Sequence, residues 1–269
     1  MSRLRPFVVI AALATAQLRA AEVTIRVANE GWNGAATENI QKLLANVAPQ
    51  FATNFPGRNF EPIFVAPGDD SPITLVGKTD RGEIRVRLTS RGNFWAQYSY
   101  QFAHEFCHIC CHYEKYWDNK HPNQWFEESL CETASLFALR RMAETWPARA
   151  PYPSWKSFAP HLGEYADKLL KDEKRKLPAG VSLAAWFREN ESSMRADGTI
   201  REKNAVVASM LLPMFEENPS RWEVVSYLND SPKKPAESFA DYLGAWRENA
   251  PRKYSAFIGR IAAQFGIEL

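Results

Sequence analysis

Gln101-Phe-Ala-His-Glu-Phe-Cys-His108 is the stretch from which the organisation of this chain can be worked out. It places His104 and His108 four residues apart, so on a helix both imidazoles lie on one face, one turn apart. Two imidazoles in that arrangement can bind the same metal ion. Glu105 follows the first histidine, where its carboxylate can reach a water molecule beside that ion and take its proton. The stretch therefore predicts a helix that carries a metal site.

The residues around this motif recur at helical spacing. An apolar stripe consists of Tyr98, Phe102, Phe106, Ile109 and Tyr113. A second, more polar face consists of Tyr100, His104, Cys107, His108 and Cys111. This pattern predicts one helix whose apolar back packs on a core and whose metal face borders a cleft.

A carboxylate-rich segment follows, Asn123-Gln-Trp-Phe-Glu-Glu-Ser-Leu-Cys-Glu132. Catalytic zinc has three protein ligands, and two histidines with one glutamate is a known set, so the acids of this segment are candidates. Adjacent helical residues point about 100° apart, so only one of Glu127 and Glu128 can face the metal. Glu132 lies one turn after Glu128, where its carboxylate can hold the second ring nitrogen of His104. This spacing favours Glu128 as the third ligand.

The two segments together resemble the gluzincin metallopeptidases, the group of thermolysin and aminopeptidase N. In that group the third zinc ligand comes from a following helix, in patterns such as N-E-x-x-x-D or W-L-N-E-G-F-A-E. Trp125-Phe-Glu-Glu-Ser-Leu-Cys-Glu132 is similar to the second pattern. The resemblance covers mainly residues 84 to 146. It implies an α+β fold, with a zincin-like upper lobe and a mainly helical C-terminal lobe.

The resemblance also implies a function. The chain would be an exported zinc peptidase in which Zn²⁺ is bound by His104, His108 and Glu128. Glu105 would act as general base and then as general acid during hydrolysis of a peptide or protein substrate. A catalytically inactive zinc-binding scaffold of the same fold is the alternative.

A weaker resemblance lies at Ile200-Arg-Glu-Lys-Asn204. It is similar to the aminopeptidase segment V-P-Y-E-K-G, whose tyrosine hydrogen-bonds the tetrahedral intermediate. Arg201 takes the tyrosine's place, and an arginine can donate to an oxyanion, so it is a candidate catalytic residue. His161, Tyr165 and Tyr227 are alternatives for this role. The aminopeptidase motif G-x-M-E-N is absent from the sequence, which puts aminopeptidase specificity in doubt.

A strand is expected directly before the motif helix, because Ile, Val and Leu alternate with arginine between Glu83 and Thr89. In gluzincins the corresponding strand rims the cleft, and extended substrate pairs with its free edge. Arg85 and Arg87 would then either favour acidic substrate residues or form a solvated outer face.

The remaining pattern predicts two lobes. Residues 21–150 form an upper lobe with the metal site, and residues 151–269 form a helical lower lobe. The ligand helix is expected to end near Glu144, because prolines follow between Trp146 and Pro153. Further strands are expected at 21–28, 60–65 and 73–76, and a helix from Thr37. Helices of the lower lobe are expected at 162–171, 183–190, 203–217, 221–228, 239–248 and 254–265.

The first residues predict a secretory signal. Met1 to Ala20 contains Arg3 and Arg5 and then an apolar segment, Phe7 to Ala16, that is too short to span a bilayer. Cleavage before Ala21 would give a secreted or periplasmic protein without a membrane span, and a retained anchor is the alternative. The 33 basic and 31 acidic residues nearly balance, so no nucleic-acid partner is expected. Oligomeric state is open.

All four cysteines lie in the two motif helices: Cys107, Cys110, Cys111 and Cys131. In the resembled arrangement the ligand helix crosses the motif helix at this level, which implies a disulfide between Cys107 and Cys131. Export would permit it, and a disulfide within one helix suits the geometry poorly. The alternatives are a cysteine metal site that includes His112, and small buried core residues.

Overall fold

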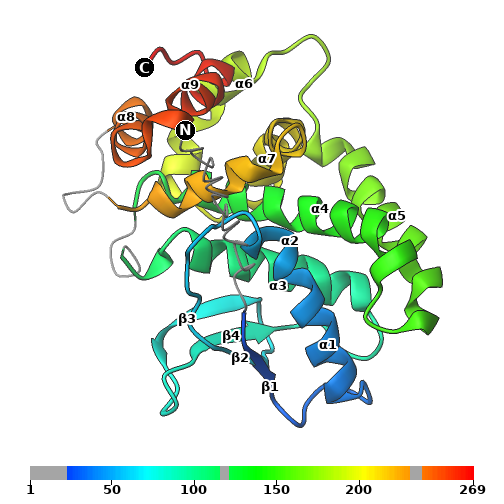
Figure 1. Cartoon of the computed structure of the whole chain (residues 1–269). Helices are drawn as coiled ribbons and strands as arrows, with labels where there is room; N and C mark the ends of the chain where they lie inside the picture. Colours follow the sequence, from blue (N-terminus) through cyan, green and yellow to red (C-terminus); the bar gives the residue numbers. More distant parts are fainter. Residues whose placement is uncertain (1–22, 116–120, 231–237) are drawn as a thin grey trace, which may run out of the picture.

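The computed structural model describes residues 23–115, 121–230 and 238–269. The predicted signal segment, residues 1–20, lies outside the described residues. Within the described ranges, no helix is both long enough and apolar enough to cross a membrane. The mixture of a small sheet with many helices confirms the α+β class (Figure 1).

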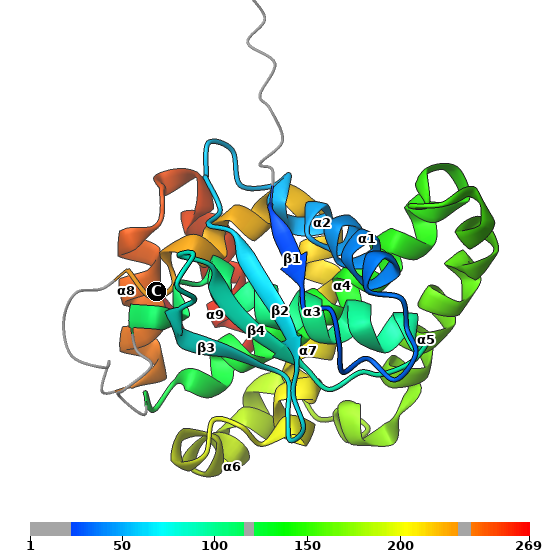
Figure 2. The ribbon, with the colours of Figure 1, turned by 90° about the horizontal axis from the view of Figure 1, so that it is seen from below.

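A four-stranded sheet lies at one side of the molecule, and the helices cover one of its faces (Figure 2). The strands are β1 (Ile25–Val27), β2 (Ile63–Pro67), β3 (Ile73–Lys78) and β4 (Ile84–Leu88), in the order β1-β2-β4-β3. The first three in that order are parallel, and β3 runs antiparallel to β4. Alternation sets the buried face: Ile84, Val86 and Leu88 are buried on β4, while Arg87 is exposed.

The free edge of the sheet is not where the resemblance implied. β4, which occupies the predicted strand of residues 83–89, is paired on both sides, with β2 and with β3. The prediction that this strand offers a free edge is therefore wrong. β3 takes that position, because the hairpin turn at Gly82 folds it back antiparallel along β4. Among the described strands, β1 and β3 each pair on one side only, and β3 is the edge strand that contacts α3.

Two long helices form the centre of the molecule. α3 (Trp95–Cys110) contains the motif, and Tyr98, Phe102, Phe106 and Ile109 of the predicted stripe are buried. Tyr113, predicted in the same stripe, lies beyond the helix in a 3₁₀ turn and donates to Leu75 O at 2.8 Å. Before them, α1 (Thr37–Val47) packs beside α3 and β1. α2 (Pro49–Ala52) packs against α4 and, through Phe51, against α3.

α4 (Gln124–Arg149) is the ligand helix, and it is buried along most of its length. It continues past the predicted end near Glu144, with Pro147 inside its last turn. A proline there removes only one hydrogen bond close to the helix end, and Trp146 beside it is buried.

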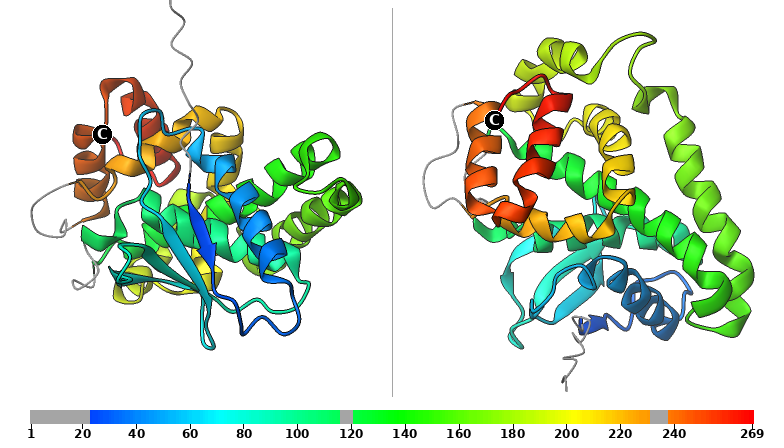
Figure 3. Two further views of the ribbon diagram at one scale, coloured as in Figure 1. Left: turned by 60° about the horizontal axis from the view of Figure 1, so that its bottom comes forward. Right: turned by 45° about the horizontal axis from the view of Figure 1, so that its top comes forward.

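The C-terminal half is helical, as predicted, and it packs on the side of α4 away from the sheet (Figure 3). Its helices are α5 (Ala159–Lys171), α6 (Leu183–Ala196), α7 (Arg201–Glu216), α8 (Phe239–Asn249) and α9 (Ser255–Gln264). The helix predicted at 221–228 is instead part of a 3₁₀ segment, Pro219–Tyr227. One buried apolar cluster joins both halves of the chain through α4.

Candidate metal centre

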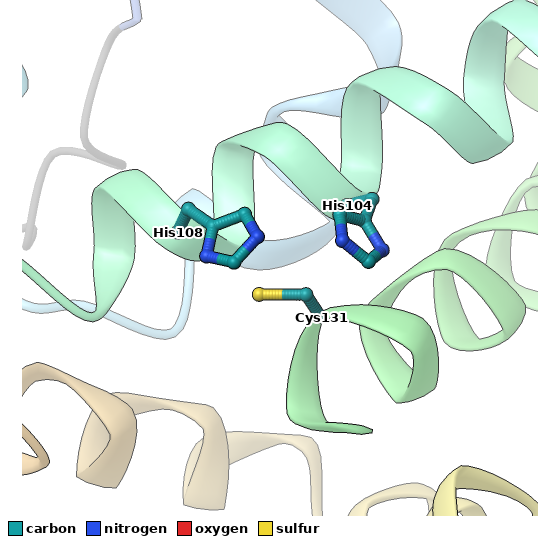
Figure 4. A group of neighbouring side chains, drawn as sticks. All are labelled: His104, His108 and Cys131. Carbon is teal, nitrogen blue, oxygen red and sulfur yellow. The ribbon is translucent and has the colours of Figure 1, made fainter. Parts of the chain in front are cut away.

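The two motif histidines lie on the face of α3 that points toward α4 (Figure 4). Their ring centroids are 5.0 Å apart, as expected for residues one turn apart on a helix. The side chains of His104 and His108 keep 20% and 14% exposure, so the pair lies near the surface without being open to it.

Glu128 of α4 faces both rings. Its Oε2 lies 3.1 Å from His104 Nε2, and its Oε1 lies 3.6 Å from His108 Nε2. One carboxylate that faces Nε2 of two histidines, with one oxygen toward each ring, gives a donor set of the kind that zinc uses. The structure thus brings together the three residues predicted as metal ligands.

The other ring nitrogens meet two further carboxylates. His108 Nδ1 lies 2.7 Å from Glu127 Oε1, and His104 Nδ1 lies 3.9 Å from Glu132 Oε2. Glu132 therefore faces His104 as predicted, at ion-pair distance rather than hydrogen-bond distance. The sequence suggested Glu127 only as the alternative third ligand, and not as the partner of a ring nitrogen. The sequence could have indicated such a partner, because each metal-binding histidine usually donates its second ring nitrogen to an acceptor, and two histidines therefore need two acceptors.

The charges around the pair are strongly coupled. Burial lowers the pKa of His108, but Glu128, Glu127 and Glu105 outweigh burial and raise that pKa to about 10. Burial raises the pKa of Glu128, but the two histidines and Arg201 lower it to about 2. The carboxylates thus favour positive charge at the two imidazole rings. A metal cation bound between these side chains can supply that charge in place of the imidazole protons.

Cys131 is a further donor that sequence reasoning did not assign to the site. One ligand atom each from His104, His108 and Cys131 lies within 4.8 Å of the others, so this cluster could hold a metal ion (Figure 4). Cys131 lies on α4 one turn after Glu128 and is fully buried. Cys131 and Glu128 are thus two alternative partners for the same histidine pair.

The cysteines do not form the predicted disulfide. All four are free thiols and buried, so the Cys107–Cys131 disulfide is wrong. The two side chains do meet, as the crossing of the helices requires, but Cys107 hydrogen-bonds to Cys111 as well as to Cys131. Packed as small apolar residues, the thiols fill the space where α3 and α4 cross.

Glu105 lies on the side of α3 nearer the sheet and is only 2% exposed. Thr74 of the edge strand β3 donates its hydroxyl to Glu105 Oε2 at 2.8 Å. The charge of Glu105 raises the pKa of both His104 and His108.

Arg201 is the first residue of α7 and is exposed. Its charge contributes to the low pKa of Glu128. Of the alternatives, His161 is exposed and paired with Glu164 on its own helix. Tyr227 donates to Glu223 at 3.5 Å, and the ring of Tyr165 lies 6.1 Å from that of Tyr100.

A cavity of about 560 Å³ lies elsewhere, between the segment after α2 and the C-terminal elements. Asn54, Arg221 and Tyr254 contribute to its walls, and none of the metal-centre residues does. The cavity therefore gives no support to the cleft predicted along the metal face.

Comparison with known proteins adds no assignment, because no protein-family model, curated protein or solved structure matches this chain. A proposal for the function therefore rests on the sequence motifs and on the arrangement of the side chains.

Proposed function

We propose that this protein is a zinc-dependent peptidase of gluzincin type with a zincin-like upper lobe. The observation that carries the proposal is the position of Glu128, whose carboxylate faces Nε2 of both His104 and His108 from the opposite helix. Glu105, the base of the H-E-x-x-H motif, is held by Thr74 of the edge strand β3.

The donor set suits zinc. Two imidazole nitrogens and one carboxylate are a known catalytic set, which leaves a fourth position for water or substrate. A second carboxylate near the other ring nitrogen of each histidine adds to the fit, since metal-bound histidines usually donate there. Zinc bound there would polarise the substrate carbonyl and make water acidic near neutral pH.

The chain's own residues would do the remaining work. Glu105 would take a proton from the attacking water and deliver it to the leaving amine. Thr74 holds one oxygen of this carboxylate, which leaves the other oxygen for the proton. Arg201 would donate to the negative charge that develops on the carbonyl oxygen.

Extended substrate would pair with β3 in place of the strand first expected. Ile73 and Val76 of this strand are 46% and 39% exposed, and Thr74 connects the strand directly to Glu105. Strand addition at such an edge recognises the peptide backbone with little regard to sequence. The proposal also includes export, as a secreted or periplasmic protein. This part rests on the signal segment predicted from the sequence.

The test is a comparison of metal content and peptide cleavage in purified protein. We expect about one zinc per chain, as in mononuclear sites, and cleavage of a peptide library. Glu105→Gln should keep the zinc and lose about 10²–10⁴-fold in turnover, the usual share of general acid–base catalysis. Glu164→Gln, an exposed glutamate on α5, is the matched control and should change neither. Unchanged hydrolysis in Glu105→Gln would reject the mechanism.

Cys131 supports a second candidate, a metal-binding scaffold without peptidase activity. If His104, His108 and Cys131 bind the ion together with Glu128, four protein ligands close the site and exclude water. Substitution with Co²⁺ distinguishes the two candidates. A thiolate ligand gives an intense sulfur-to-cobalt charge-transfer band that disappears in Cys131→Ser, whereas the peptidase site gives none.

A further inference from the structure

Two residues of the C-terminal half reach the carboxylates that face the motif histidines. Asn229, which precedes α8, donates Nδ2 to Glu127 Oε2 at 2.6 Å. Arg175, in a 3₁₀ turn after α5, donates to Glu132 Oε1. Both contacts join segments far apart in the sequence, and neither residue belongs to a motif.

The first connection is continuous from Asn229 to His108. Glu127 uses Oε2 to accept from Asn229 and Oε1 to face His108 Nδ1 at 2.7 Å. Asn229 is itself fixed, because Nδ2 also donates to Cys111 O at 2.9 Å and its Oδ1 accepts from Tyr242 at 3.3 Å. With one oxygen held, the Glu127 carboxylate cannot rotate away from the ring.

The second connection runs from Arg175 to His104. Arg175 and Tyr100 both donate to Glu132 Oε1, so Oε2 is the oxygen left to face His104 Nδ1 at 3.9 Å. The side chains of Arg175 and Glu132 are only 11% and 6% exposed. A buried carboxylate with a fixed arginine partner keeps its orientation.

We propose that Asn229 and Arg175 are positioning residues that orient His108 and His104 through Glu127 and Glu132. Glu127 at hydrogen-bond distance and Glu132 as a charge 3.9 Å away both favour a proton on Nδ1, so that each ring binds a metal through Nε2. The consequence for metal binding rests on the proposed zinc site, whereas the orientation of the rings does not. The C-terminal half would thus set the affinity of a site whose ligands all lie in the N-terminal half.

The first experiment measures zinc affinity by competition with a chromophoric chelator. Asn229→Ala and Arg175→Ala should each bind zinc about 10–100-fold more weakly, as for other partners of metal ligands. Arg175→Lys keeps a charge beside Glu132 and should lose less, which also covers the case that Arg175→Ala does not fold. In a Glu132→Gln background, Arg175→Lys should cost nothing further, because Arg175 acts through Glu132.

Arg140→Ala is the matched control, since Arg140 on α4 also pairs with a glutamate of the C-terminal half, Glu216, but does not contact the histidines. It should bind zinc like the wild type. The proposal is overturned if the Asn229 and Arg175 variants stay within about threefold of wild-type affinity, well below the effect of losing such a partner. It is also overturned if Arg140→Ala loses as much affinity as they do.

The second experiment needs no metal. Long-range ¹H–¹⁵N NMR of metal-free protein reports whether each ring nitrogen of each histidine carries a proton and whether that proton is hydrogen-bonded. Asn229→Ala should change the Nδ1 signal of His108, and Arg175→Lys that of His104, each leaving the other histidine unchanged. Unchanged spectra in both variants would refute the positioning role. If wild-type protein binds no zinc, the proposed function fails, and these spectra still decide the role of the two residues.

Discussion

Glu127 and Glu128 are neighbours on α4 but meet different nitrogens. Glu128 faces Nε2 of both histidines, whereas Glu127 faces only His108 Nδ1. Glu128→Ala should therefore weaken zinc binding most, and Glu127→Ala by about 10–100-fold, as expected for a residue that holds a ligand. Chelator competition measures both, with the exposed Glu144→Ala as control. If Glu127→Ala abolishes binding while Glu128→Ala keeps it, the assignment of the ligand is wrong by one residue.

A second residue-scale feature is the ion pair between Glu83 and Arg26, which ties β1 to the start of β4. Arg26 donates to both carboxylate oxygens of Glu83, at 2.7 and 2.5 Å, and Thr79 donates at 2.8 Å. These contacts, the Arg26 hydrogen bond above all, lower the pKa of Glu83 from 4.5 to about 2.

This pKa predicts a pH dependence of stability. Because the folded-state pKa lies below the unfolded one, the contribution of Glu83 is complete above pH 4.5 and is lost as the pH falls toward about 2. Denaturant unfolding at several pH values should show that Glu83→Gln loses stability at neutral pH and has a shallower decline in acid. Glu61→Gln, in an exposed pair with Lys78, should behave like the wild type. Parallel curves for Glu83→Gln and wild type would contradict the prediction.

At the scale of elements, the end of α3 depends on a residue from outside the helix. The last carbonyls of a helix have no partner within it, and a positive charge there is favourable. Arg58 donates to Ile109 O and Cys110 O, each at 2.7 Å, and to Ser226 at 3.0 Å. This guanidinium thereby joins the motif helix to the C-terminal half.

Arg58→Ala should destabilise the protein by about 2 kcal/mol, the usual contribution of hydrogen bonds to a charged group. Urea unfolding measures the change. Arg141→Ala removes an exposed i,i+3 pair on α4 and should stay within about 0.5 kcal/mol of wild type, as surface substitutions usually do. Equal midpoints for the two variants would show that the carbonyls are satisfied without Arg58.

At the scale of the whole molecule, the two halves share one core. Trp222 is fully buried and stacks on Phe215 at 4.1 Å between ring centroids. Its ring also meets Phe51 of α2 at 5.2 Å and Phe137 of α4 at 5.4 Å. A side chain from the C-terminal half thus completes the packing around elements of the N-terminal half.

The shared core predicts a single cooperative unfolding transition for the chain, in place of two lobes that melt separately. Trp222→Ala should lower the free energy of unfolding by about 3–5 kcal/mol, as large-to-small core substitutions do. Calorimetry shows both the number of transitions and the shift. Trp186→Ala, at a half-buried position on α6, should cost clearly less. Two resolved transitions, with only one affected by Trp222→Ala, would favour independent lobes.

Local patterns were enough for the features that depend on neighbouring residues. The stripe of α3 and the alternation in β4 predict each element and its buried face, because helix and strand periods are properties of a short segment. For the same reason, the sequence brings His104, Glu105 and His108 to one helix. The rotation of 3.6 residues per turn showed that only one of Glu127 and Glu128 can face the metal. The choice of Glu128 rested on Glu132 one turn further on, and it stays a prediction.

Only the tertiary structure decided the features that depend on distant segments. The partners of β4, and hence β3 as the edge strand, follow from a sheet order that no local period encodes. The contacts of Arg175 and Asn229 with the metal-site carboxylates join residues separated by 43 and 102 positions. Such contacts depend on how complete helices pack, and packing sums many small, non-directional interactions that no short motif records.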